Sequence, residues 1–328
     1  MIDRRLFLLF GAGALAAPLR ALAEQRKIWR IGQLSVVARA SYVESGRPQA
    51  FLDALRQLGH LEGRDFTLEE RYADGKTERL PALAEELVAA KVDMIVTVGT
   101  NAGHAAKHAT SSIPIVLAAA SDPLASGLVG SLARPGGNIT GLSLNATDVG
   151  PKNVELLLLA APNTSRLAML IFPSHPMHAA RLKVVQAAAA SMNVAVLPME
   201  VRKAEDFAGA FAQMKRERAD ALIVPAEALF FSQRRKLAEL AVEHRLPSMF
   251  AYRDAVAAGG LMSYGTDLRD VSRHAASYVH KIIRGAKLGD LPIEEPTTLR
   301  LVINRKTAQA LGISLSQTLL VRADELIG

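Results

Sequence analysis

The feature that most constrains the fold of this chain is an alternation of short, continuous apolar segments with amphipathic ones. The apolar segments suit strands that are buried on both faces, and the segments between them have helical spacing. In the first part of the chain we expect strands at 28–37, 65–72, 92–98, 114–119 and 139–143, and helices at 48–58, 78–90, 101–109 and 124–132. This order predicts a parallel sheet covered by helices on both faces.

The same alternation restarts near Val149. Here we expect helices at 149–161, 177–192, 204–218 and 228–245, and strands at 167–172, 194–201, 221–224, 247–251 and 261–264. Two successive series predict an α/β fold of two doubly wound parallel-sheet lobes. A helix at 271–284, a strand at 298–303 and a helix at 306–311 are too little for a third domain. They must complete the two lobes, which predicts several chain crossings and a hinge between them.

The N-terminus predicts export. Arg4 and Arg5 precede an apolar stretch at 6–19, and small residues at Ala21 and Ala23 suit cleavage by a signal peptidase. The arginine pair also resembles a twin-arginine signal, and an uncleaved membrane anchor is the alternative interpretation. We therefore predict a signal peptide at 1–23, a first lobe at 24–143 plus 266–292, a second lobe at 144–265 plus 293–328, and a periplasmic location.

Composition excludes several classes of protein. The chain has no cysteine, so it has neither a disulfide nor a cysteine for lipid attachment after the apolar stretch. The net charge is +7, but the basic residues are scattered and lack interleaved aromatic residues, so we expect no nucleic-acid partner. No P-loop or GxSxG motif occurs, and no pair of acids is placed for acid–base catalysis. We expect no enzymatic activity and no cofactor.

Ligands of open parallel sheets lie beyond the carboxyl ends of the strands. The hydroxyls there suit a carboxylate, and Asp122 or Glu227 would suit an amine; the alternative is that these residues only cap helices. The residues at these positions are Thr100, Asn101, Ser121, Asp122 and Ser143 in the first lobe, and Glu227, Tyr252 and Asp254 in the second.

Two histidine pairs raise the question of a metal. His104 and His108 are four residues apart on an expected helix, a spacing that can hold zinc, and His175 and His178 form a second pair in a proline-containing turn. Without cysteine or an HExxH motif, solvated helix histidines are the favoured interpretation. We expect no metal site.

Several motifs together resemble a known family. They are SDPLASGLV at 121–129, LARPGGNITG at 132–141, LGHLEGR at 58–64, LVINRKTA at 301–308, LGI at 311–313 and LLVRAD at 319–324. They resemble the ABC transporter substrate-binding proteins related to tryptophan- and tyrosine-binding components. This resemblance implies the type I periplasmic binding protein fold, a Venus-flytrap of two lobes around a cleft.

The resemblance also implies a function. The protein would be the solute-binding component of an ABC importer, a monomer that binds an amino-acid-like or carboxylate-bearing solute, closes at its hinge and docks on a membrane permease. A periplasmic ligand sensor or a hydrolase on the same fold is the alternative. Carried over by position, the ligand contacts fall at Thr100, Asn101, Ser121, Asp122 and Ser143, and near Glu227, Tyr252 and Tyr264. The chain departs from typical members at 226–230 and 250–254.

Overall fold

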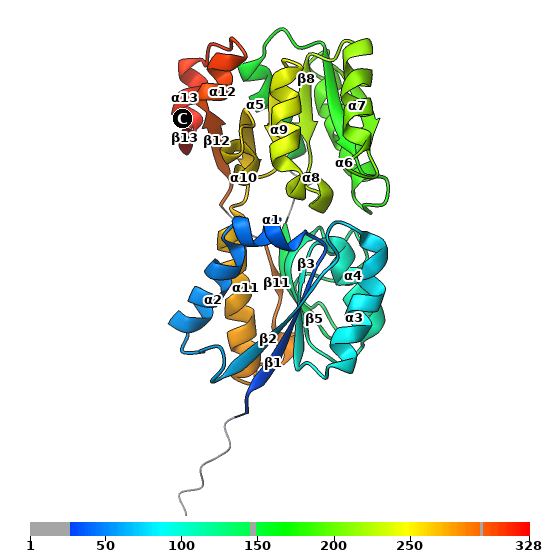
Figure 1. Cartoon of the computed structure of the whole chain (residues 1–328), viewed down its shortest axis with the longest axis vertical. Coiled ribbons are helices and arrows are strands. Elements are labelled where there is room, and N and C mark those ends of the chain that lie inside the picture. Colours follow the sequence, from blue (N-terminus) through cyan, green and yellow to red (C-terminus); the bar gives the residue numbers. More distant parts are fainter. Residues whose placement is uncertain (1–26, 145–148, 296–297) are drawn as a thin grey trace, which may run out of the picture.

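The structure, a computed structural model, describes residues 27–144, 149–295 and 298–328. The predicted signal peptide at 1–23 lies outside these residues. Figure 1 shows two lobes, one above the other, with the C-terminus in the upper lobe. Among the described residues, no helix has the length and apolar character that crossing a bilayer requires.

The first lobe is built on a six-stranded sheet in which all strand pairs are parallel. The strand order is β11-β5-β4-β3-β1-β2. Helices α2 and α11 pack together on one side of the sheet, and α3 and α4 on the other (Figure 1). The strands are β1 (Trp29–Ser35), β2 (Phe66–Tyr72), β3 (Met94–Val98), β4 (Ile115–Ser121), β5 (Ile139–Leu144) and β11 (Ile293–Glu294). The helices are α1 (Arg39–Glu44), α2 (Arg47–Gln57), α3 (Leu80–Ala89), α4 (Thr100–Ala109) and α11 (Leu268–Ile283).

The second lobe is built on a seven-stranded sheet with the order β13-β12-β10-β9-β8-β6-β7. It is parallel except where β12 runs antiparallel to β10. The strands are β6 (Arg166–Ile171), β7 (Ala195–Glu200), β8 (Ala221–Val224), β9 (Ser248–Phe250), β10 (Met262–Gly265), β12 (Arg300–Asn304) and β13 (Glu325–Ile327). The helices are α5 (Gly150–Ala160), α6 (His178–Ala190), α7 (Asp206–Arg216), α8 (Ala228–Ser232), α9 (Arg234–Glu243), α10 (Arg253–Ala257), α12 (Arg305–Ala310) and α13 (Gln317–Arg322).

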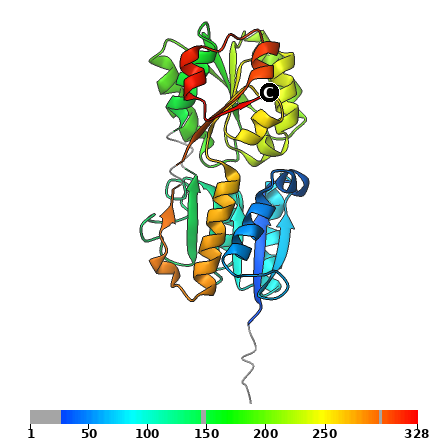
Figure 2. The ribbon, with the colours of Figure 1, turned by 90° about the vertical axis from the view of Figure 1, so that its left-hand side faces the viewer.

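The chain passes between the sheets three times, after β5, after β10 and after β11. Figure 2 shows the segment after β10 entering the lower lobe as α11. The expected α/β architecture of two doubly wound lobes is confirmed. Two expected boundaries shift slightly: Leu144 belongs to β5, and Ile293 and Glu294 form β11 beside it. The shift arises because Ile293 N donates a hydrogen bond to Leu132 O, which holds this segment at the edge of the first sheet.

Some expected helices are wrong. Residues 124–132 form turns, because the N–H groups of Leu128 and Val129 both bond to Pro123 O and Gly127 has a positive φ of 78°. The helix expected at 228–245 is divided at Gln233 into α8 and α9. Helices α1, α10 and α13 are too short for the sequence pattern to predict them.

Candidate functional site

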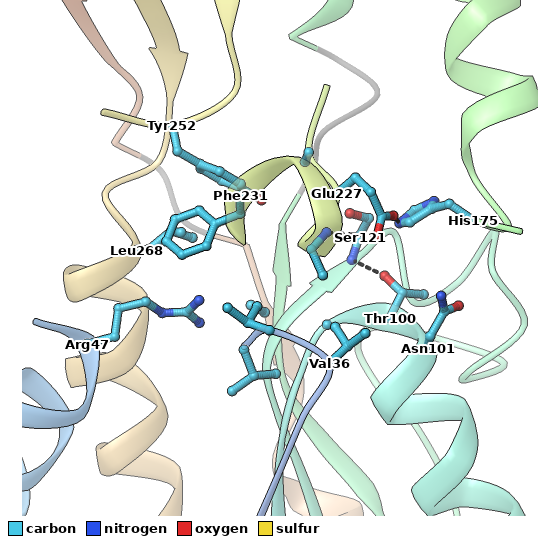
Figure 3. A pocket seen from close by; sticks show the side chains of 16 residues that line it. Val36, Arg47, Thr100, Asn101, Ser121, His175, Glu227, Phe231, Tyr252 and Leu268 are labelled. Carbon is cyan, nitrogen blue, oxygen red and sulfur yellow. Dashed lines mark hydrogen bonds and ion pairs between the residues drawn. The ribbon is translucent and has the colours of Figure 1, made fainter. Parts of the chain in front are cut away.

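The first-lobe side of the site forms where β3 and β4 end. Gly99 follows β3 with a φ of 103°, and a Cβ there would lie 2.6 Å from Val36 Cγ1, so glycine is required for the turn into α4. Thr100 is buried at the start of α4, and its Oγ1 accepts a hydrogen bond of 2.9 Å from Ser121 N (Figure 3). Two residues predicted from separate strand ends therefore lie side by side.

The second-lobe side centres on Glu227, which follows β8. The residue is 7% exposed, and its side-chain Oε1 accepts hydrogen bonds from Ala228 N at 2.8 Å and Leu229 N at 3.3 Å. Glu227 is therefore the N-cap of α8. Burial raises the pKa of Glu227 to about 7, although the two backbone N–H groups and the charge of Arg181 oppose the shift. A group with this pKa can exchange a proton near neutral pH.

Two histidines lie beside Glu227. His175 Nδ1 accepts a hydrogen bond from Met177 N at 3.1 Å, and His178 Nδ1 accepts one from Phe172 N at 2.8 Å. Burial lowers the pKa of His175 to about 2 and that of His178 to about 3, so both rings are neutral. The expectation of solvated histidines is wrong for this pair, because both side chains are buried.

The same three residues are the candidate metal group. Ligand atoms of His175, His178 and Glu227 lie within 4.8 Å of one another. Each neutral ring, however, uses Nδ1 as an acceptor and so carries its proton on Nε2. A metal that bound Nε2 would have to displace this proton. His104 and His108, on α4, belong to no such group among the described residues. The hydrogen bonds favour a structural role for the buried pair.

Residues of both lobes line one cavity of about 50 Å³, which we call the interlobe cavity. Figure 3 shows Thr100, Asn101 and Ser121 on the first-lobe side, opposite Glu227 and His175. The aromatic rings of Phe231 and Tyr252 face it from the second lobe, with centroids 6.0 Å apart. The lining residues are Val36, Val37, Arg47, Val98, Gly99, Thr100, Asn101, Ala119, Ser121, His175, Ala226, Glu227, Ala228, Phe231, Tyr252 and Leu268.

Arg47, at the start of α2, adds a positive charge to this cavity. It is 2% exposed, its guanidinium lies over the ring of Tyr42, and its Nε donates a long hydrogen bond of 3.5 Å to Ser272 Oγ. Its Nη2 has no hydrogen-bond partner among the described residues. Figure 3 shows the guanidinium directed toward the cavity.

A second cavity of about 50 Å³ lies on the hinge side of the first and shares Ala226 and Tyr252 with it. We call it the hinge-side cavity, because Leu144, Thr266 and Leu299 in its wall belong to or border the segments that cross between lobes. The remaining lining residues are Val149, Gly150, Asn153, Met169, Arg181, Val185, Ile223, Pro225, Ala251, Tyr264 and Gly265.

The other predicted site residues take different places. Tyr264 lines the hinge-side cavity. Asp122, with a φ of 40°, lines neither cavity, and its Oδ1 accepts a hydrogen bond of 3.0 Å from Ala125 N. Ser143 is buried within β5 and Asp254 lies in the first turn of α10; neither residue lines the interlobe or the hinge-side cavity. Burial raises the pKa of Asp254.

Sequence reasoning missed Arg47 and Arg181, and it did not recognise that His175 and His178 are buried. The sequence did carry a signal for Arg181, because His178 and Arg181 are three residues apart in the first turn of α6 and so lie on one helix face, while His175 precedes this helix by three residues. Arg47 had no comparable signal, because it follows Gly46 at the beginning of an ordinary amphipathic helix.

Known proteins share this architecture. A curated tyrosine-binding protein of Clostridioides difficile is 25% identical over 265 residues, covering 81% of this chain and 76% of that protein. The structure of an ABC domain from Streptococcus pneumoniae in complex with L-Trp is similar with a TM-score of 0.84 and 26% identity, over 92% of this chain and all of that one. A conserved domain protein of Vibrio cholerae is similar with a TM-score of 0.85, 26% identity and the same coverage.

The sequence profile described as ABC transporter substrate binding protein matches residues 44–327. This match covers far more than half of the chain, including both lobes and the motifs at 121–141 and 301–324. The resemblance drawn from those motifs is therefore confirmed, and the family is one of binding proteins, not of enzymes. The chain belongs to the family of ABC transporter substrate-binding proteins.

Proposed function

We propose that this protein works in the periplasm, where it binds a small amino-acid-like or carboxylate-bearing solute between its lobes and presents it to the permease of an ABC importer. The observation that carries this proposal is the interlobe cavity, to which both lobes contribute polar groups. Thr100 and Ser121 supply hydroxyls from one side, and Glu227 and Tyr252 supply groups from the other. A solute that contacts both sides would hold the lobes together.

Direct contacts between the lobes support a hinge-closure mechanism. In α8, the hydroxyl of Ser232 accepts a hydrogen bond of 3.3 Å from Ala38 N of the first lobe. The backbone carbonyl of Ser232 accepts a second one, of 3.2 Å, from Ser41 Oγ. Glu44 in α1 pairs with Arg234 at 2.5 Å and with Arg235 at 3.3 Å. These contacts close one edge of the cleft. A solute that binds this arrangement more tightly than an open one shifts the population toward it.

The chemistry of the cavity supports an organic acid or amino acid as the solute. Hydroxyls at the start of α4 and the end of β4 can hydrogen-bond to polar groups of the solute, and the rings of Phe231 and Tyr252 offer an apolar surface for its side chain. Relatives named for tyrosine and solved with L-Trp make these two amino acids the first compounds to test.

A thermal-shift titration tests the proposal. Purified protein is heated with L-tryptophan, L-tyrosine and a panel of other amino acids and organic acids, and native mass spectrometry looks for a co-purified solute. We expect a melting temperature that rises with ligand concentration, as mass action requires. No adduct and no shift across the whole panel would contradict the proposed function.

A pair of serine variants places the binding event. Ser121→Ala removes a hydroxyl that lines the interlobe cavity, whereas Ser143→Ala removes a buried hydroxyl that lines neither cavity. We expect Ser121→Ala to weaken binding about fivefold, the value of one hydrogen bond of about 1 kcal/mol. Ser143→Ala should leave the dissociation constant unchanged. Equal effects of the two variants would place the solute elsewhere.

A further inference from the structure

The hinge-side cavity contains a buried cation that the surrounding protein does not neutralise. Arg181 is 4% exposed, and its Nη1 donates a long hydrogen bond of 3.3 Å to Ala226 O. Among the described residues, its Nε and Nη2 have no hydrogen-bond partner and no carboxylate forms an ion pair with it. Burying an unpaired charge costs several kcal/mol, so a position of this kind needs a compensating role.

The groups around Arg181 leave its charge in place. His178 Nε2 lies 3.3 Å from Ala226 O, the same carbonyl that Arg181 contacts, and both histidines of this corner are neutral. Glu227 attracts Arg181 electrostatically, but its Oε1 is occupied by the backbone N–H groups of α8 and its Oε2 lies 4.0 Å from His175 Nε2. Two guanidinium donors therefore remain for an external acceptor.

The other residues that line the hinge-side cavity indicate the chemical character of the molecule that carries this acceptor. Most of the lining is apolar, including Val149, Met169 and Ile223. Among the described residues of this wall, one other buried polar side chain has an atom without a hydrogen-bond partner, namely the Oδ1 of Asn153. An apolar environment strengthens a charge-assisted hydrogen bond, and a planar guanidinium matches the two oxygens of a carboxylate.

We propose that Arg181 binds a carboxylate group of the solute in the hinge-side cavity, and that the solute is an organic acid with an apolar body. This inference rests on the proposed function and names the chemical class of its ligand. The Nε and Nη2 groups would donate to the two carboxylate oxygens, and the apolar body would extend past Tyr252, which lines both cavities, toward Phe231. Because Leu144, Thr266 and Leu299 line the same cavity, the carboxylate would bind next to the crossing segments.

Matched pairs of probes test this assignment on the full protein. Each pair is a carboxylate and its uncharged amide: indolepropionate with indolepropionamide, hydroxyphenylpropionate with its amide, and hexanoate with hexanamide. Tryptamine supplies an amine without a carboxylate, and L-tryptophan supplies both groups. We expect at least one carboxylate to raise the melting temperature and to bind at least tenfold more tightly than its amide, and we expect no shift with tryptamine.

Variants then assign the preference to this residue. Arg181→Gln should weaken binding of the carboxylate by about thirtyfold or more and remove the difference from the amide, whereas Arg181→Lys, which keeps the charge but loses the paired donors, should fall between. Lys183→Gln, the same change of charge at an exposed position of α6, is the control and should bind like the wild type.

The melting temperature without ligand separates a binding role from a structural one. Removing an unpaired buried cation should leave the ligand-free melting temperature of Arg181→Gln unchanged or raise it. A large fall in this temperature, with an unchanged preference for carboxylate over amide, would overturn the inference.

The probe results also separate the inference from the function on which it rests. Binding of L-tryptophan or tryptamine that is insensitive to Arg181→Gln would overturn the inference and leave the proposed function intact. The absence of any shift, from any compound in the panel, would overturn both.

Discussion

The two walls of the cleft use different physical means to present polar groups. Apart from Arg47, the first-lobe wall is a product of backbone geometry: Gly99 turns the chain, and Thr100 and Ser121 then meet through one hydrogen bond. The second-lobe wall depends on buried ionisable side chains, chiefly Glu227 and Arg181. The first wall is thus shaped by where strands end and helices begin, and the second by which side chains those elements carry.

This difference has an energetic counterpart. Thr100 contributes to folding as well as to the cavity, because its hydroxyl satisfies a backbone N–H. Arg181 is buried with two nitrogens that have no partner in the described part of the chain, and Glu227 is buried with a pKa of about 7, so burying either side chain costs desolvation free energy. Strain and unpaired charge of this kind are typical of binding sites, where stability is reduced in favour of a ligand.

The largest effect should come from Gly99→Ala in the first-lobe wall. The alanine would have to keep the backbone φ of 103°, and its Cβ would lie 2.6 Å from Val36 Cγ1. Backbone strain and overpacking each cost about 1 to 3 kcal/mol, so the free energy of unfolding should fall by about 3 to 5 kcal/mol. Chemical denaturation measures the loss.

Gly127→Ala is the matched control for this substitution. Gly127 also has a positive φ, of 78°, but no atom lies within 4 Å of a Cβ built there. Gly127→Ala should introduce backbone strain without a steric overlap, so its free energy of unfolding should fall by only about 1 to 2 kcal/mol. Equal losses at the two positions would mean that the contact with Val36 does not shape this wall.

The second prediction concerns the buried charge of the other wall. The pKa of Glu227 is about 7 in the folded protein and 4.5 without burial, so the folded state keeps its proton at pH values where the unfolded state has lost it. Wild-type stability should therefore fall, relative to Glu227→Gln, as pH rises from about 4.5 to about 7. The difference should reach about 3 kcal/mol above pH 7.

Denaturation curves of both proteins at several pH values measure this effect. The glutamine keeps an oxygen that can accept from the N–H groups of Ala228 and Leu229, so the cap of α8 is preserved. A pH-independent difference between the two proteins would contradict the assigned pKa, and a wild type that gains stability as pH rises would reverse its sign.

The same contrast explains how much the sequence could predict. The order of strands and helices and the positions of Thr100 and Ser121 follow from local apolar periodicity and from the rule that ligands lie at the carboxyl ends of strands. Arg47 and Arg181 could not be found in this way, because they lie on helices that resemble any other amphipathic helix. Their burial is decided by the packing of α2 and α6 and by the approach of the other lobe.

Asp122 shows the opposite failure. It follows β4 directly, as a ligand-binding residue should, but a φ of 40° and the turn at 123–129 direct its carboxylate to Ala125 N. Position in the sequence locates a strand end to within one or two residues. It does not determine the direction of a side chain in a turn that contains proline and glycine.

The third prediction tests whether the two walls act together. Glu44→Gln should weaken the contact of α1 with Arg234 and Arg235, so the closed arrangement should lose about 1 kcal/mol, given that Glu44 is largely exposed. The solute should then bind about fivefold more weakly, and the ligand-free protein should show a larger radius of gyration in X-ray scattering.

Glu86→Gln is the control for this variant, because Glu86 forms a comparable pair with Arg71 at 2.7 Å within the first lobe. It should alter neither the affinity nor the radius of gyration. If both variants weaken binding equally, the pair between Glu44 and the second lobe has no special part in closure.

The smallest effect should come from Asp122→Ala. Because Asp122 lines neither cavity, the dissociation constant should stay within twofold of the wild-type value, and the lost hydrogen bond to Ala125 N should lower the free energy of unfolding by about 0.5 to 1 kcal/mol. Calorimetric titration with the solute found in the thermal-shift panel, together with denaturation, measures both. A large loss of affinity would show that Asp122 binds the solute, and the strand ends of the first-lobe wall would then contribute a charged side chain as those of the second wall do.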